Sequence, residues 1–568
     1  MSMRAPRLLL RNPTTWVLAT LLVLYFVGIR WGLPATDGWD DDGVAPRDFL
    51  YGLYQTYAPG QHYVYPPAHL ILLAILSAWV WLPVLLRVPT LRSSALIGAF
   101  VTPSTMTAMA MIARLVQVSM SVGLVYVITR LTGEVAGRRA GLFAAIVCGL
   151  DGVLTYYAHT SNLDVPALLW GTGGLWLLAR AIARDEPRLL RSVGLLAALA
   201  TATKDQSAGL FVLTIPLALA GWIACCPPTA GVRRMLADAT IGMGTGLIVL
   251  AVLDGMIVNP AGLSERLRFL LGSASADFAR VPPGLAHWPR LLGAALGRVQ
   301  DFAPCPVLAL IPLGLLVRLP GSIEARRRLA ALVPLLAALS FTITFTLAAR
   351  RSEHRFLMPQ VILLSVPAGI ALDYLWSFQP GSLRLCARAL VLLLAGMALR
   401  QALASDIALM DDPRYRIEAI LEARVRAGDL IETYGVNTYQ PRFPPRARVV
   451  RVDDRRPLAS RNPLPGVVEI LARYDGLGER RPDWVVAPRA WTNRWLIAAD
   501  GLRSPLEELL AQDSVARQYF ATLQAGALPG YIRVATASCA AGFWPRPRIH
   551  NSTCQEVDLL QRVASDGP

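Results

Sequence analysis

An acidic segment near the start of the chain holds side chains suited to proton transfer. Five aspartates fall within residues 37–48: Asp37, Asp40, Asp41, Asp42 and Asp48. Adjacent carboxylates repel one another, which raises the pKa of at least one of them and suits it to accept a proton near neutral pH. A solvated acidic turn and a cation site are the alternatives. The spacing therefore predicts a general base among residues 40–42, with both alternatives open.

Aromatic residues follow the acidic segment and lead into an apolar run at 68–86. They are Tyr51, Tyr54, Tyr57, Tyr63 and Tyr65. Tyrosine rings commonly anchor at the membrane–water interface. Pro66 and Pro67 open the apolar run, where the missing N–H of a proline costs little. The acidic segment is therefore expected at a membrane surface.

The basic residues are almost all arginine. The chain has 55 basic and 39 acidic residues, for a net charge of +16, and its single lysine is Lys204. The arginines lie between apolar runs instead of in one patch, which argues against a nucleic-acid-binding protein. The retained ammonium at position 204 favours a site that needs a compact, strongly hydrated charge. A coding bias toward arginine, with Lys204 left by chance, is the alternative.

Composition identifies the elements that must position these residues. Hydrophobic residues make up 54% of the chain and charged residues 17%, with a mean hydropathy of +0.44. Ordinary soluble domains carry about 25% charged residues, which excludes a soluble enzyme. A helix that crosses the membrane needs about 20 mainly apolar residues, and about eleven such spans are predicted. They lie near 14–31, 106–129, 140–156, 163–179, 192–203, 207–225, 236–257, 304–319, 329–348, 356–376 and 386–404.

Arginine-rich turns set the orientation of the spans. The N-terminal tail and the turns at 130–139, 180–191, 318–328 and 384–388 are basic, which places them in the cytoplasm. The run at 68–86 must then lie in the interface or re-enter, unless it crosses and 87–105 hides another crossing. Four loops and turns then fall outside, at 32–67, 157–162, 258–303 and 349–355, and residues 405–568 lie outside as well.

The short outer turn at 349–355 breaks the charge rule, since it carries Arg350, Arg351 and Arg355 beside His354. Snorkelling of these side chains to the interface is one explanation. Contact with an anionic lipid headgroup is the other. We favour the second because translocation of a long loop does not account for so short a turn.

Residues 405–568 change composition and form a second domain after the membrane domain at 1–404. Helix-like runs at 413–426, 466–474 and 504–512 alternate with strand-like segments "DLIETYG", "ARVVRVD", "DWVVAP" and "YIRVATAS". This alternation predicts a small α/β layer. Cys539 and Cys554 both lie in this outer region, where a disulfide is chemically allowed; two free thiols are the alternative.

Several motifs occur in order along residues 14–404. The acidic segment is followed by "YPP" and the interfacial run. Asp164 lies at the outer end of a span within "TYYAHTSNLDVPALLW", Lys204 in "LLAALATATKDQSAGLFVL" and Arg355 in "SEHRFLMPQVILL". In this order the chain resembles the GT-C superfamily of membrane glycosyltransferases, in the branch of protein O-mannosyltransferases and bacterial aminoarabinose transferases.

The resemblance implies an all-α membrane domain with an outer C-terminal α/β domain. It also implies transfer of a sugar, with inversion, from a polyprenyl-phosphate donor to a hydroxyl of a lipid, glycan or protein at the outer face. The expected partners are the donor, the acceptor and membrane lipids, without nucleic acid. The arginine bias favours a bacterial inner membrane with a cytoplasmic N-terminus and a periplasmic C-terminal domain.

Residue roles follow from the matched motifs. The base falls in the triplet Asp40, Asp41 and Asp42, and the resemblance does not separate Asp41 from Asp42. The resemblance implies that Lys204, Arg355 and His354 bind the donor phosphate. Asp164 is expected to be a supporting residue or a helix N-cap. Tyr65 stands where the family often has a basic residue. No cofactor or metal is expected, although the triplet leaves a divalent cation open.

Two rival functions remain. A transporter or flippase of a lipid-linked substrate would carry its charges in broken helices within repeated halves. A non-catalytic envelope assembly protein would bind a partner through its soluble domain.

Overall fold

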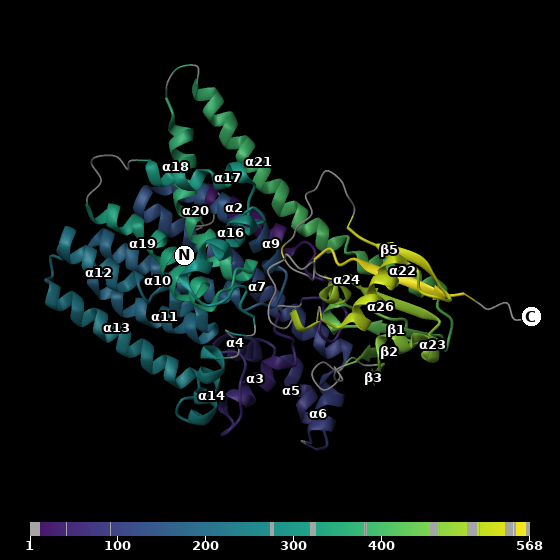
Figure 1. Ribbon diagram of the computed structural model, residues 1–568. Helices are drawn as coiled ribbons and strands as arrows, with labels where there is room; N and C mark the ends of the chain where they lie inside the picture. The colour runs from purple at the N-terminus through teal and green to yellow at the C-terminus, as the bar shows by residue number, and fades with distance from the viewer. Residues whose placement is uncertain are drawn as a thin grey trace, which may run out of the picture.

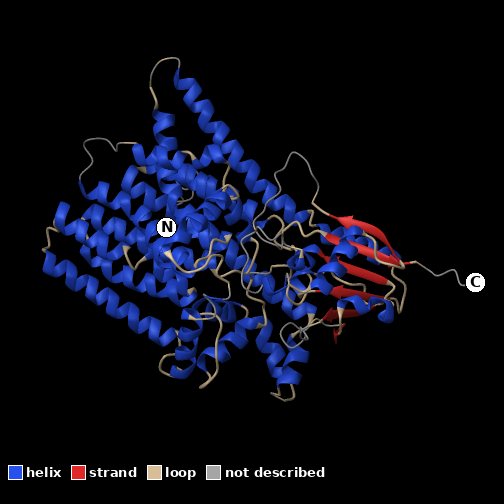
Figure 2. Cartoon of the chain, viewed as in Figure 1, coloured by secondary structure: helices blue, strands red, loops and turns tan. Residues whose placement is uncertain are grey.

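The computed structural model describes residues 12–40, 43–90, 92–272, 276, 278–317, 325–379, 381, 383–454, 464, 466–496, 508–510, 512–539, 549 and 553–563. A large bundle of helices carries a smaller α/β domain at one end, and the long helix α21 runs from the bundle toward that domain (Figures 1 and 2). The predicted fold class, a helical membrane protein with a C-terminal sheet, is thus observed.

The bundle takes up residues 13–410. Its helices are α2 (Pro13–Phe26), α3 (Asp48–Tyr57), α4 (Ala68–Leu76), α5 (Ala78–Arg87), α6 (Ser93–Phe100), α7 (Pro103–Ala136), α8 (Arg138–Gly149), α9 (Gly152–Ala158), α10 (Asp164–Arg184), α11 (Leu190–Thr203), α12 (Thr214–Cys225), α13 (Val232–Leu253), α14 (Pro260–Leu271), α16 (Trp288–Val299), α17 (Cys305–Leu308), α18 (Leu310–Leu316), α19 (Ala325–Phe341), α20 (His354–Ser377) and α21 (Leu383–Met410).

Six helical segments in the described ranges are long and apolar enough to cross a membrane, or up to eight if two bent pairs are counted. The six are α7, α10, Asp205–Cys225, α13, Ala325–Leu347 and α20. The predicted interfacial run is one of the bent pairs, since α4 and α5 meet at 74°; α8 and α9 meet at 68°. Two shorter apolar segments, Pro13–Phe26 and Cys305–Leu316, add to the bundle.

Small residues allow the helices to approach one another closely. A Cβ added at Gly194 in α11 would lie 2.0 Å from the carbonyl oxygen of Gly242 in α13. Such contact between backbones is typical of helix packing in membranes, where dispersion replaces the hydrophobic drive between helices. Closely packed helices hold the turns between them in fixed positions.

The C-terminal domain contains a six-stranded sheet with the order β3-β2-β1-β4-β6-β5. The strands are β1 (Leu430–Tyr434), β2 (Arg448–Asp453), β3 (Val467–Leu471), β4 (Trp484–Pro488), β5 (Tyr531–Ala537) and β6 (Val557–Arg562). The first four are parallel, and β6 runs antiparallel to both β4 and β5. The α-helices of the domain are α22 (Pro413–Arg424), α23 (Leu477–Arg480), α24 (Arg489–Thr492) and α26 (Ser514–Ala525), within the described residues.

Helices cover both faces of this sheet. Ile417 and Leu421 of α22 pack against Ile431 and Val449 on one face, and Phe520 of α26 packs with Tyr434 on the other. The predicted α/β layer is therefore present. The four predicted strands are confirmed, but the helix predicted at 466–474 is wrong, because Val467–Leu471 pairs with β2 as a strand. The helix expected at 504–512 lies largely outside the described residues.

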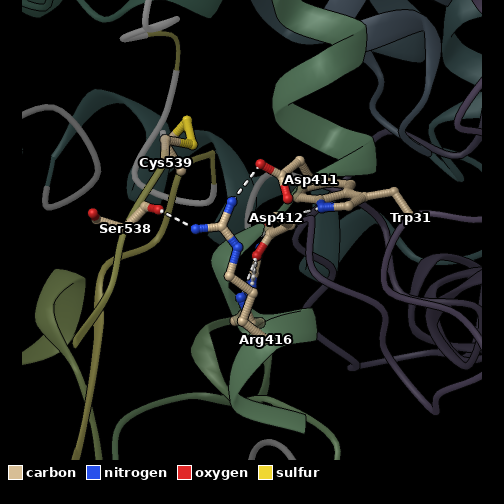
Figure 3. Close-up of a disulfide and its surroundings, with 8 residues drawn as sticks. Trp31, Asp411, Asp412, Arg416, Ser538 and Cys539 are labelled. Carbon is tan, nitrogen blue, oxygen red and sulfur yellow. Dashed lines mark hydrogen bonds and ion pairs between the residues drawn. A yellow bond between two sulfur atoms is a disulfide. The ribbon is translucent and has the colours of Figure 1, made fainter. Parts of the chain in front are cut away.

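A disulfide joins Cys539 and Cys554, whose Cα atoms are 5.2 Å apart. The segment before Cys539 lies close to the start of α22, where the Arg416 guanidinium donates to the Ser538 carbonyl (3.2 Å) and to Asp411 (2.5 Å) (Figure 3). The disulfide thus stands near the junction between the bundle and the α/β domain.

Candidate active site

Asp40 is the member of the acidic triplet that the structure describes. Its side chain is buried beside the turn between α9 and α10, with the Tyr156 hydroxyl 3.5 Å from Oδ1 and the Ser161 amide 3.4 Å from Oδ2. A Cβ added at Gly43 would lie 2.3 Å from Asp40 Oδ2. Asp41 and Asp42 lie outside the described residues, so their predicted role as the base stays a prediction.

The other acids of the segment have different partners. Asp37 pairs with Arg47, and Asp48 lies farther from this guanidinium, at 3.8 Å. Burial raises the pKa of Asp48, Arg47 lowers it and Asp37 raises it again, with a net upward shift. Repulsion between neighbouring carboxylates therefore contributes to proton affinity in this segment.

Asp164 and Lys204 form a shielded ion pair. Asp164 is the first residue of α10, only three positions after Ser161, and its amide donates to the Asn162 side chain. Lys204 follows α11 in an extended conformation and donates to Asp164 Oδ1; the side chains are 16% and 8% exposed. Among the described residues Asp164 Oδ2 has no hydrogen-bond partner. The structure thus brings together two predicted site residues from separate motifs.

Three cations surround the ring of Phe356, a buried residue at the start of α20. Lys204 Nζ lies 5.4 Å from the ring centroid, and the guanidinium carbons of Arg351 and Arg355 lie at 4.5 and 4.8 Å. Cations at this range are attracted to the ring face. The ring therefore gathers positive charge from the end of α11 and the 349–355 turn in one place.

Acidic side chains balance part of this charge. Glu353 lies 3.2 Å from Arg280 and 3.4 Å from Arg351. Burial alone would raise the pKa of Glu353, but the two arginines lower it below its usual value. For Arg351 burial lowers the pKa, because it disfavours the charged guanidinium, and Glu353 raises it. The turn thus holds its arginines close together with an ionised glutamate among them.

Tyr65 and His354 are two further predicted residues, and their surroundings differ. Tyr65 is 41% exposed. His354 Nε2 lies 2.9 Å from Oδ2 of Asp301, a carboxylate on a neighbouring loop. Of His354 and Arg355, which the sequence predicted together, His354 therefore contacts Asp301 and Arg355 lies beside Phe356.

Arg266 was not singled out by the sequence as a site residue, although it is among the arginines of the 258–303 loop. It is 2% exposed, donates to the carbonyls of Tyr63 and Val64, and pairs with Asp205. It thereby links the segment before Tyr65 to the turn that carries Lys204. The signal that could have pointed to it is the number of arginines in the 258–303 loop, which breaks the charge rule for a loop predicted to lie outside.

The two halves of the site are chemically different. Asp40 and Asp164 lie next to the short turn between α9 and α10. Lys204, one of the cations around Phe356, contacts the end of this turn through its ion pair with Asp164. A carboxylate can accept a proton from a hydroxyl, and a partly dry group of cations can stabilise a departing phosphate. Within the described ranges, which omit Asp41 and Asp42, no group of three His, Cys, Asp or Glu side chains could hold a metal ion.

Comparison with known proteins confirms the predicted resemblance to the GT-C glycosyltransferases. Residues 95–253 match the family described as dolichyl-phosphate-mannose-protein mannosyltransferase. This stretch includes Asp164 and Lys204, whereas the acidic segment and Arg355 lie outside it. No curated protein matches the chain.

The chain is also similar to several solved structures, at low sequence identity. ArnT from Cupriavidus metallidurans, bound to undecaprenyl phosphate, is 14% identical with a TM-score of 0.49 and covers 97% of this chain and 98% of its own. The oligosaccharyltransferase AglB from Archaeoglobus fulgidus, in complex with an inhibitory peptide and a dolichol-phosphate, is 11% identical with a TM-score of 0.47, at 97% and 88% coverage. The arabinofuranosyltransferase AftD from Mycobacteria is 16% identical with a TM-score of 0.42, at 98% and 42% coverage.

Proposed function

We propose that this protein is an inverting membrane glycosyltransferase that moves a sugar from a polyprenyl-phosphate donor to an acceptor hydroxyl at the outer face of the membrane. The observation that carries the proposal is the gathering of Lys204, Arg351 and Arg355 around Phe356, next to the turn that holds Asp40. A lipid phosphate arriving from the bilayer meets fixed cations there, beside a carboxylate that can take a proton. The acceptor is a lipid, glycan or protein.

In this reaction the general base is a residue of the acidic triplet, Asp40, Asp41 and Asp42. A carboxylate of Asp41 or Asp42, with Asp40 next to them, takes the proton of the acceptor hydroxyl. The hydroxyl oxygen then forms a bond to the anomeric carbon as the bond from that carbon to the phosphate oxygen breaks. Attack from the face opposite the phosphate inverts the configuration. The electron pair of the broken bond leaves with the lipid phosphate.

The remaining residues bind and position the donor. Lys204 and Arg355 neutralise the charge that develops on the phosphate, and a positioned donor in a dry site contributes strongly to such a step. Asp164 orients Lys204 through their ion pair. Tyr65 contacts the donor at the membrane edge, and His354 positions the 349–355 turn through Asp301.

We place the protein in a bacterial inner membrane, with its N-terminus in the cytoplasm and residues 405–568 in the periplasm. The eleven predicted crossings correspond to α2, α7, α8 with α9, α10, α11, Asp205–Cys225, α13, α17 with α18, α19, α20 and α21. The Cys539–Cys554 disulfide supports this placement, because disulfides persist in oxidising compartments. Cys225 and Cys226 are free thiols on the predicted cytoplasmic side.

Mass analysis of a strain that lacks the protein tests this function. We expect a polyprenyl-phosphate sugar to accumulate in the outer leaflet and one sugar-modified envelope component to disappear. Accumulation in the cytoplasmic leaflet would support the flippase instead. Unchanged lipid-linked sugars and envelope glycans would support the assembly protein.

A further inference from the structure

We infer that the C-terminal α/β domain positions the acidic segment of the active site, with Arg442 and Asn437 as the positioning residues. This inference rests on the proposed function, because it gives the domain a role in the same reaction. Residues 31–40 lie between α7 and the C-terminal domain, and both sides bind them through polar contacts.

The bundle binds the start of this segment through α7. The buried Arg114 guanidinium donates to the carbonyls of Ile29 (2.6 Å) and Trp31 (2.7 Å). Farther along, the Thr107 hydroxyl accepts from the amide of Ala35 (3.1 Å). These contacts fix one side of the segment to a membrane helix.

The first helix of the C-terminal domain binds the opposite side. The indole N–H of Trp31 donates to Asp412 at the start of α22 (3.0 Å), as Figure 3 shows. The amide of Gly32 donates to the Tyr415 hydroxyl (3.1 Å). The Arg414 guanidinium lies over the ring of Trp39, 4.1 Å from its centroid. Trp31 and Trp39 are thereby held by a helix that lies almost 400 positions later in the chain.

The segment at 437–442 provides the remaining contacts. The side-chain amide of Asn437 donates to Asp37, and the indole N–H of Trp39 donates to the Gln440 carbonyl (2.8 Å). Arg442 donates to the Leu33 carbonyl (2.8 Å) and pairs with Glu418 of α22. Trp39 is 2% exposed and directly precedes Asp40, so these bonds set the position of that carboxylate.

The place of Asn437 in the sheet explains why this surface binds the segment. In open parallel sheets, ligands bind outside the carboxyl ends of the strands, where the strand order reverses. Here the reversal lies between β1 and β4, and Asn437 is the third residue after the end of β1. Arg451 of β2 donates to Asn437 and fixes its amide. The edge that commonly holds a soluble ligand thus holds Asp37.

Arg442→Ala in the full-length protein, purified in detergent, tests the inference against Arg446→Ala. The two arginines are matched, since Arg446 pairs with Glu422 of α22 and donates to the Val425 carbonyl of its own domain. We expect Arg442→Ala to increase hydrogen exchange in residues 29–40 and to lower kcat at least tenfold, with KM for an undecaprenyl-phosphate sugar changed less than twofold. Arg446→Ala should change neither, and Arg442→Lys should recover part of kcat.

Trp39→Phe serves as a second variant if Arg442→Ala does not fold, because it keeps an aromatic side chain and removes the indole N–H that donates to Gln440. Unchanged exchange in Arg442→Ala and Trp39→Phe would overturn the inference. Faster exchange with unchanged kcat would also overturn it. The exchange measurement does not depend on transfer, so failure of the proposed function would show separately, as equal transfer by the wild type and by variants of the acidic triplet.

Discussion

Lys204 and Asp164 form an ion pair shielded from water, so loss of either partner leaves a buried charge. Removing one member of such a pair costs about 3–5 kcal/mol. We therefore expect Lys204→Met to lower the stability of the purified protein by about this amount in thermal unfolding. Lys204→Met with Asp164→Asn should recover most of the stability, because no charge remains unpaired.

A measurement of sugar transfer distinguishes the role of Lys204 in stability from its role in binding the donor phosphate. The double variant should fold but transfer poorly, since the cation beside Phe356 is missing. Lys204→Arg should also fold and retain only part of the activity, because a planar guanidinium does not reproduce a compact ammonium. Wild-type transfer by the double variant would show that the pair serves only stability.

At the scale of one element, the 349–355 turn depends on an ionised Glu353. Its pKa is lowered in the folded protein, so its contribution to stability is complete above the usual value of 4.5 and is lost as the pH falls through the folded value. We expect Glu353→Gln to unfold at a lower temperature than the wild type at pH 7. The gap should close as the pH falls below 4.5.

Glu422→Gln is the control for this measurement. Its side chain is 64% exposed and pairs with Arg446, and exposed pairs contribute about 0–1 kcal/mol. Its unfolding temperature should therefore stay near that of the wild type across the same pH range. A gap for Glu353→Gln that widens toward low pH would contradict this account of the turn.

The disulfide is a second element with a measurable contribution. It closes a loop with a sequence separation of 15, for which the chain-entropy relation gives about 3 kcal/mol. We expect Cys539→Ser to destabilise the C-terminal domain by about that amount. In intact cells, Cys539 and Cys554 should react with a maleimide only after reduction. Labelling of both without a reductant would contradict the disulfide.

At the scale of the whole molecule, the sequence predicted the parts that have local signals. Hydropathy located the helices of the bundle, and short apolar segments between helix-like runs located β1, β2, β4 and β5. Ordered motifs placed Asp164, Lys204 and Arg355 in one site, where the first two now form a pair and the third shares the ring of Phe356 with Lys204. The helices and strands could be predicted because each depends on residues close together in the chain, whereas the roles of Asp164, Lys204 and Arg355 in catalysis stay predictions.

Contacts across the whole chain had no such signal. The bond between Trp31 and Asp412 joins residues 381 positions apart, and nothing in either neighbourhood predicts the other. The same holds for Asn437 and Asp37, 400 positions apart. β3 was missed for a different reason, since a short apolar run fits a helix or a strand until its neighbour β2 is known.

The most direct test of the central claim is sugar transfer by the purified full-length protein. Undecaprenyl-phosphate mannose and other labelled undecaprenyl-phosphate sugars would serve as donors, with an envelope extract from the deletion strain as acceptor. We expect the wild type to release undecaprenyl phosphate and label the acceptor, and Asp41→Asn or Asp42→Asn to lower transfer at least a hundredfold with unfolding unchanged, the scale of a lost general base. Full transfer by the variant with both substitutions, or no transfer by the wild type from any donor, would contradict the account.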